Sequence, residues 1–240
     1  MMMKLIKLLI YIFLANFIFI NPIFAATLTA TPTKYEVTMK KVELCTSSAC
    51  TTTTVLAEKD GTFDIASASA GADVGSWITG YALEIGTTYT HIKATISSTF
   101  TIRGYLTDDG SNGLSAAYCV TAASPITASS GTSPAIVAES SATTNADMSW
   151  MVPNREDADN GAFYGSTIAT TFDANGITKV NDAATFTWIG ALSSSYTPTA
   201  SSAPKITIKF DVTSQLQAAG VSNQCGIYVK PPKVSVTLTD

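Results

Sequence analysis

The chain offers few side chains for catalysis. His91 is the only histidine, so a catalytic triad or a histidine-based metal site would depend on that one ring. Strand alternation places it beside Tyr89 and Lys93 on the more polar face of a strand, which favours a surface histidine in a cross-strand pair. The sequence contains no Gly-x-Ser-x-Gly, His-Glu-x-x-His or phosphate-binding glycine motif. No local pattern nominates the two carboxylates of a glycosidase, so we predict no catalytic residues and a protein that is not an enzyme.

Two short acidic runs are rich in the hard oxygen ligands that calcium prefers. They are Glu156, Asp157, Asp159 and Asn160 and, as a second run, Asp108, Asp109 and Asn112. Neither run is an EF-hand, because the glycine is out of place and no glutamate closes the loop. Asp, Asn and Gly also form ordinary turns, which is the simpler interpretation. We therefore expect no cofactor, with calcium at residues 156–160 as the alternative.

Aromatic side chains that could stack on a glycan are spread over the chain. They are Trp77, Tyr81, Trp150, Tyr164, Trp188 and Tyr196. For any one of them, packing in the core is favoured over stacking on a ligand. Two or three coplanar, exposed rings would indicate a carbohydrate-binding module, and a buried set would favour a structural subunit.

The chain contains four cysteines, Cys45, Cys50, Cys119 and Cys225. An even number in an exported protein indicates disulfides, and four cysteines allow three pairings. Cys45 and Cys50 flank a short turn between two strand-like runs, so the simplest pairing closes that hairpin and leaves Cys119 with Cys225. That second bridge would favour one interlocked domain. A zinc site with four thiolates is the alternative, but the paired Cys-x2-Cys spacing of common zinc modules is missing.

The first 25 residues have the pattern of a secretory signal peptide. Lys4 and Lys7 form a basic start, Leu8 to Ile20 an apolar run, and Pro22 to Ala25 a helix-breaking end with a small last residue. The apolar run is short of the roughly 20 residues that cross a bilayer. We predict cleavage after Ala25, no membrane span in the mature chain, and a secreted, periplasmic or cell-surface location.

The composition argues against nucleic acid as a partner. The net charge is −4 and only 13% of the residues are charged, so the chain has no basic field to attract a polyanion. Ser, Thr, Ala and Gly dominate instead, and threonine in particular suits strand surfaces. A weakly charged exterior that is rich in hydroxyl groups follows.

The segment from Thr87 to Gly104 organises the predicted fold. Its even-numbered residues from Thr90 to Ile102 are mostly apolar and its odd-numbered residues are mostly polar, which is the period of a half-buried strand. The segment is longer than a typical strand. We therefore expect a bend or bulge near Ser97-Ser98 that lets it serve two neighbours.

Other segments alternate in the same way, and a slip in phase predicts a second bulge at Lys40-Lys41. The predicted strands include 77–85, 148–152, 163–172, 177–180, 184–192, 205–213, 225–230 and 233–239. A turn is predicted at residues 59–61 and one helical turn at residues 214–219. The pattern predicts an all-β, antiparallel sandwich of the jelly-roll or immunoglobulin-like kind with about ten to twelve strands. We expect one domain over residues 26–240, with a loop-rich insertion around 122–204.

Three motifs follow one another between residues 37 and 96. They are Val37-Thr-Met-Lys-Lys-Val42, then Phe63-Asp64-Ile65, then Leu83-Glu-Ile-Gly86 followed by Tyr89 and Ile92-Lys93. This order resembles a family of secreted bacterial β-sandwich domains of unknown function. The chain departs from that family at Glu84-Ile85, where Pro-Ala is usual, and at Lys93, where arginine is usual. The resemblance implies a sandwich fold and an exported location but no activity.

These observations favour an exported, non-enzymatic structural or adhesive protein of the cell surface. Exposed strand edges would pair with neighbouring copies, and the segment from Ala26 to Lys34 is a candidate donor strand. The alternative is a soluble module that binds carbohydrate or calcium.

Overall fold

The computed structural model describes residues 28–67, 78, 81–108, 114, 116–130, 134–155, 167–220 and 224–240. Within these residues the chain forms sixteen strands and one short helix, and every strand pairing is antiparallel. The prediction of an all-β, antiparallel fold with two disulfides is therefore confirmed. The strands outnumber the predicted ten to twelve because the segments expected to be loops contain short strands.

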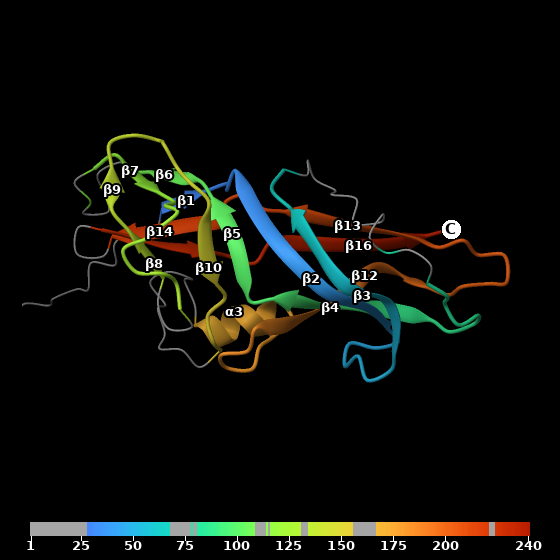
Figure 1. Ribbon diagram of the computed structural model, residues 1–240. Coiled ribbons are helices and arrows are strands. Elements are labelled where there is room, and N and C mark those ends of the chain that lie inside the picture. Colours follow the sequence, from blue (N-terminus) through green and yellow to red (C-terminus); the bar gives the residue numbers. More distant parts are fainter. Residues whose placement is uncertain are drawn as a thin grey trace, which may run out of the picture.

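The largest sheet is built around β2 (Lys34–Cys45). On one side β2 pairs with β3 (Thr53–Asp64), and on the other side it pairs with β4 (Tyr89–Ser97) and β5 (Thr99–Arg103). The predicted bulge at Lys40-Lys41 is confirmed, because the register of β2 shifts between Met39 and Lys41 against both β3 and β4. Figure 1 shows β2 crossing the middle of the molecule, with β5 and β4 lying along it in turn.

Three further strands complete this sheet. β12 (Thr185–Tyr196) pairs with β4, β10 (Met148–Met151) pairs with β5, and β11 (Ile177–Thr178) pairs with β12. The strand predicted at residues 184–192 is confirmed as β12, which extends four residues further and is a long member of the main sheet.

The predicted strand from Thr87 to Gly104 forms β4 and β5, and it changes partners at Ser98. The Ser98 N–H donates to Ala184 O at 2.8 Å and its Oγ donates to Ala183 O at 2.8 Å, while its carbonyl accepts from the Val152 N–H at 2.8 Å. These bonds satisfy the backbone polar groups at the point where the segment stops pairing with β12 and starts pairing with β10. The expected bend, with two neighbours served by one segment, is confirmed.

A second layer is formed by a long hairpin near the end of the chain. Its outer part pairs β13 (Lys205–Asp211) with β16 (Lys233–Thr239), and its inner part pairs β14 (Leu216–Gly220) with β15 (Cys225–Val229). The Lys230 N–H donates to Gln215 O at 2.8 Å and joins the two parts. We call β13 to β16 the terminal ribbon. It runs along the length of the molecule in Figure 1.

Short strands gather around the inner part of the terminal ribbon. β1 (Leu28–Ala30) pairs with β14, and β8 (Ala135–Val137) pairs with β15. A small separate sheet contains β6 (Tyr105–Thr107), β7 (Tyr118–Val120) and β9 (Glu139–Ser140).

Two predictions of helix and strand are wrong. The helical turn expected at residues 214–219 is largely strand β14, because pairing with β1 and β15 on its two sides outweighs local helix preference. In the segment 163–172, predicted as a strand, the described residues from Ile168 belong to the helix α3 (Ile168–Ala174). Thr167 caps this helix, since its side chain accepts from the Thr170 N–H.

Two further boundaries differ from the prediction. The turn expected at residues 59–61 lies inside β3, where pairing with β2 continues through Gly61 and Thr62. Residues 81–85 do not form the expected strand. Tyr81 is held instead by its hydroxyl, which donates to the carbonyl of Pro204.

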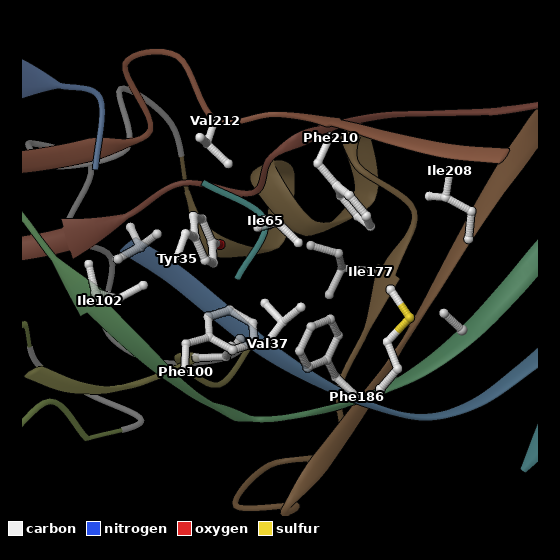
Figure 2. Packing of buried hydrophobic residues seen from close by; sticks show 14 of the residues in the cluster. Tyr35, Val37, Ile65, Phe100, Ile102, Ile177, Phe186, Ile208, Phe210 and Val212 are labelled. Carbon is white, nitrogen blue, oxygen red and sulfur yellow. The ribbon is translucent and has the colours of Figure 1, made fainter. Parts of the chain in front are cut away.

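The core lies between the main sheet and the terminal ribbon. Figure 2 shows side chains of β2, β5 and β12 facing those of β13. The ring centroids of Tyr35 and Phe100 are 5.5 Å apart, and Phe186 meets Phe100 edge-on at 6.0 Å. Ile208 and Phe210 reach the same core from the ribbon. Two layers with one apolar interior are the arrangement of a sandwich.

Candidate functional site

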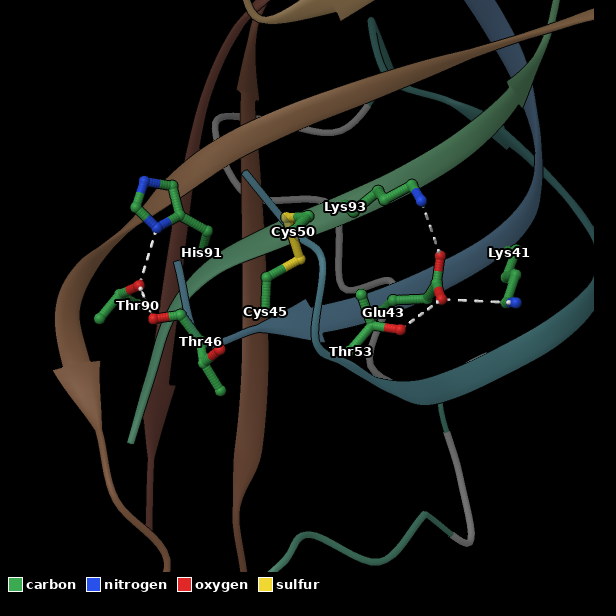
Figure 3. The surroundings of a disulfide bond; sticks show 9 residues. All are labelled: Lys41, Glu43, Cys45, Thr46, Cys50, Thr53, Thr90, His91 and Lys93. Atoms are coloured by element: carbon green, nitrogen blue, oxygen red, sulfur yellow. Dashed lines mark hydrogen bonds and ion pairs between the residues drawn. A yellow bond between two sulfur atoms is a disulfide. The ribbon is translucent and has the colours of Figure 1, made fainter. Parts of the chain in front are cut away.

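The first disulfide closes the turn between β2 and β3, as predicted. Cys45 and Cys50 are five residues apart and bonded. Beside them the buried carboxylate of Glu43 accepts a hydrogen bond from Thr53 Oγ1 at 2.9 Å (Figure 3). Lys41 and Lys93 approach the two oxygens of the same carboxylate at 3.4 and 3.6 Å. The negative charge is thus neutralised by strand neighbours, which indicates a structural role for this group.

His91 lies on β4 near the same turn (Figure 3). Its Nδ1 is 2.8 Å from Thr90 Oγ1, and that hydroxyl donates to Thr46 O at 3.1 Å. Because the hydroxyl proton is engaged by Thr46, the Thr90 oxygen is left to accept from the imidazole N–H. Tyr89, which we expected on the polar face beside His91, is instead buried, and its hydroxyl bonds Thr54 Oγ1 at 2.9 Å.

The second predicted disulfide is also present. Cys119 of β7 is bonded to Cys225 of β15 across 106 residues of sequence. The bond ties the small sheet to the terminal ribbon. Both pairs are as predicted, and with all four thiols in disulfides a four-thiolate zinc site is not formed.

The calcium hypothesis concerns residues outside the described part of the chain. Glu156, Asp157, Asp159 and Asn160 all lie there, as do Asp109 and Asn112 of the second run. Within the described residues, no group of three or more His, Cys, Asp or Glu side chains comes together as a metal site. Calcium at residues 156–160 therefore stays a prediction.

The described aromatic candidates pack into the protein. Trp150 and Tyr196 are buried, and Tyr81 and Trp188 pack against the core. The other two candidates, Trp77 and Tyr164, lie outside the described residues. None of these four described rings is exposed, so they do not form the coplanar, exposed set that a carbohydrate-binding face would need.

The outer edge of β3 is the candidate interaction site. In the described part of the chain β3 pairs with β2 alone. The middle of β3 carries Glu58, Lys59 and Asp60. The segment Thr53–Ala57 before them is uncharged and exposes Val55, with 43% of its surface accessible. We call Thr53–Ala57 the uncharged edge. Sequence reasoning missed it, because the position of a strand in its sheet depends on strand order, which local pattern does not reveal.

The predicted donor strand lies at another edge. Leu28–Ala30 forms β1, which pairs with β14 of its own chain, and residues 26 and 27 lie outside the described residues. Exchange of this segment between copies stays a prediction.

The chain matches no family model, no curated protein and no solved structure. Among the described residues, no helix has the length and apolar character needed to cross a membrane. Two disulfides are consistent with an oxidising extracellular or periplasmic environment.

Proposed function

We propose that the protein is an exported, non-enzymatic structural or adhesive subunit of the cell surface that associates with its own copies through the uncharged edge of β3. The observation that carries the proposal is Val55, an apolar side chain 43% exposed on a strand that pairs on one side only within the described residues. Soluble proteins usually protect such edges with charge, proline or cover. The signal-like start of the chain and its disulfides support an exported location.

An antiparallel pair centred on Val55 would make this edge self-complementary. The register of β3 against β2 shifts within the edge, where Leu56 is the extra residue between Val55 and Ala57. Thr53 of each copy would lie opposite Ala57 of the other, so the same residues serve both partners, as a twofold interface requires. The charged run Glu58–Asp60 of each copy would then lie beyond the paired segment. The β1 edge is a weaker candidate, because β1 has only three residues and can form few hydrogen bonds with a neighbouring copy.

Substitution of Val55 by lysine tests the proposal, with Val180→Lys as the matched control. Val180 is also an exposed valine, at 74%, but lies outside the strands. We expect the parent protein and Val180→Lys to self-associate with rising concentration and Val55→Lys to remain monomeric, because two lysines would face each other across the twofold axis. Analytical ultracentrifugation gives the mass. A parent protein that stays monomeric at high concentration, or a Val55→Lys variant that still associates, would refute this edge as the interface.

A further inference from the structure

A buried lysine lies against a buried asparagine beside the main sheet. Lys179 directly follows β11 and is 5% exposed, and Asn154 comes shortly after β10 and is 6% exposed. The Lys179 side chain donates a hydrogen bond from Nζ to Asn154 Oδ1. Lysine is almost never buried to this extent unless its amino group is engaged. The two residues are 25 positions apart in the chain, so the fold brings them together.

Ser98 holds both segments in place. The Val152 N–H, two residues before Asn154, donates to Ser98 O at 2.8 Å. Ser98 Oγ donates to the carbonyl of Ala183, the residue after Asp182, at 2.8 Å. The main sheet therefore fixes the two segments relative to each other.

Asp182 engages the side-chain amide of Asn154 through two groups. Its backbone N–H donates to Asn154 Oδ1 at 2.9 Å, and its carboxylate accepts from Asn154 Nδ2 at 2.9 Å. Asp182 has a φ of 59°, which is uncommon for a residue other than glycine. A donor at the amide oxygen polarises the carbonyl carbon, and a carboxylate at the amide nitrogen can carry a proton to it. Because Asp182 is exposed, its carboxylate can exchange protons with solvent.

We propose that Lys179 and Asn154 form an intramolecular amide cross-link, with Asp182 as the catalytic residue. The amine form of Lys179 attacks Asn154 Cγ, which lies about 1.2 Å from the Oδ1 atom that Nζ contacts. The new Nζ–Cγ bond replaces the Cγ–Nδ2 bond. One proton of the amine passes to Nδ2 through the Asp182 carboxylate, and Nδ2 leaves as ammonia. The reaction consumes no oxidant and no second molecule.

The cross-link would join the segment after β10 to the end of β11, with α3 between them in the chain. A covalent link between distant residues restricts the unfolded chain and so stabilises the fold. Unlike the two disulfides, an amide bond is not broken by thiol reagents. The site is separate from the uncharged edge of β3 and does not depend on the proposed self-association.

Intact-mass spectrometry of the purified, reduced mature protein tests the proposal. We expect a mass lower than that calculated from the sequence by the mass of one ammonia. A tryptic digest should contain the peptide with Asn154 joined to the peptide with Lys179, and trypsin should not cut after Lys179. A parent protein with the full calculated mass, or a digest without the joined peptide, would overturn the proposal.

Three variants assign the roles. Lys179→Arg keeps a cation but removes the amine, so it should show the full mass and melt at a lower temperature than the parent. Lys209→Arg is the matched control, since Lys209 is exposed on β13, and it should still lose ammonia. Loss of ammonia that persists in Lys179→Arg would indicate a succinimide instead and overturn the proposal. Asp182→Asn keeps the backbone N–H and removes the carboxylate, so it should retain the full mass, and complete cross-linking in this variant would overturn the role of Asp182.

Discussion

The two disulfides lie in regions of opposite construction. Around Cys45–Cys50 the strands are long, and β2, β3 and β12 contain twelve residues each. Around Cys119–Cys225 the strands β1, β6, β7, β8 and β9 contain two or three residues each, and β14 and β15 contain five. We call these the long-strand region and the short-strand region. The short strands gather at the left of Figure 1.

The difference shows two ways of holding a sheet together. A long ladder has many backbone hydrogen bonds and cross-strand contacts, so it is stable without a covalent link. Strands of two or three residues have few such contacts, and each must be positioned by its neighbours. In the short-strand region a long-range disulfide restricts the unfolded chain instead. The cross-link should therefore matter more there than at the β2–β3 turn.

The largest effect is expected from Cys119→Ala combined with Cys225→Ala. On the chain-entropy model, loss of a cross-link between residues 106 apart costs about 4 to 5 kcal/mol of the free energy of unfolding. That is a large part of the roughly 5 to 15 kcal/mol that stabilises a typical domain. Amide hydrogen exchange should show lost protection in β7, β14 and β15 and retained protection in β2 and β4. Equal loss in both regions would contradict the contrast drawn between them.

A smaller effect is expected from Cys45→Ala combined with Cys50→Ala. This cross-link closes a loop with a separation of five residues, so its removal should cost about 2 kcal/mol. The ladder between β2 and β3 and the bonds of Glu43 remain. Urea unfolding of the two double variants side by side measures the difference. A larger loss for this pair than for the long-range pair would reverse the comparison.

The smallest effect concerns an ion pair where β2, β5 and β10 meet. Lys34 Nζ bonds Asp147 Oδ2 at 2.9 Å, and Arg103 Nε lies 2.7 Å from Oδ1. The hydrogen bond from Lys34, aided by the charge of Arg103, holds the pKa of the Asp147 carboxyl below its usual value. Because the pKa of the carboxyl is lower in the folded state, its ionised form stabilises the fold at pH values above the unfolded pKa of about 3.9. This contribution is lost as the pH falls through the folded pKa.

Asp147→Asn should therefore lower the melting temperature slightly at neutral pH and leave it unchanged at a pH below the folded pKa. The effect is small because the Asp147 side chain is 39% exposed and water screens its charge. Asp60→Asn in the long-strand region is the control, since its bond to Lys40 is more exposed. Melting curves between about pH 2 and pH 7 compare the two. An equal pH dependence for both variants would argue against a special role for Asp147.

The alternation of apolar and polar residues predicts a strand correctly where one face of that strand is buried. The alternation of residues 205–213 and 233–239 predicts the outer part of the terminal ribbon, and both strands are present. Pattern failed at residues 214–219, because a strand buried on both faces does not alternate. All of Leu216, Gln217, Ala218 and Ala219 are buried. It failed again at Lys59-Asp60-Gly61, where pairing with β2 outweighs the turn preference of these residues.

The candidate interaction site could not be predicted from the sequence. The uncharged edge exists because, among the described residues, β3 pairs on one side only, and strand order is a property of the whole sheet.

The sequence by itself determined the fold class and the central strand with its change of partner near Ser98, and it favoured, among three possible pairings, the two disulfides that the structure contains. These follow from alternation along one segment and from the short spacing of Cys45 and Cys50. Only the tertiary structure decided which strand forms the edge of the main sheet and where the short strands join. Those features depend on contacts between residues far apart in the chain, and local hydrophobic periodicity carries no information about them.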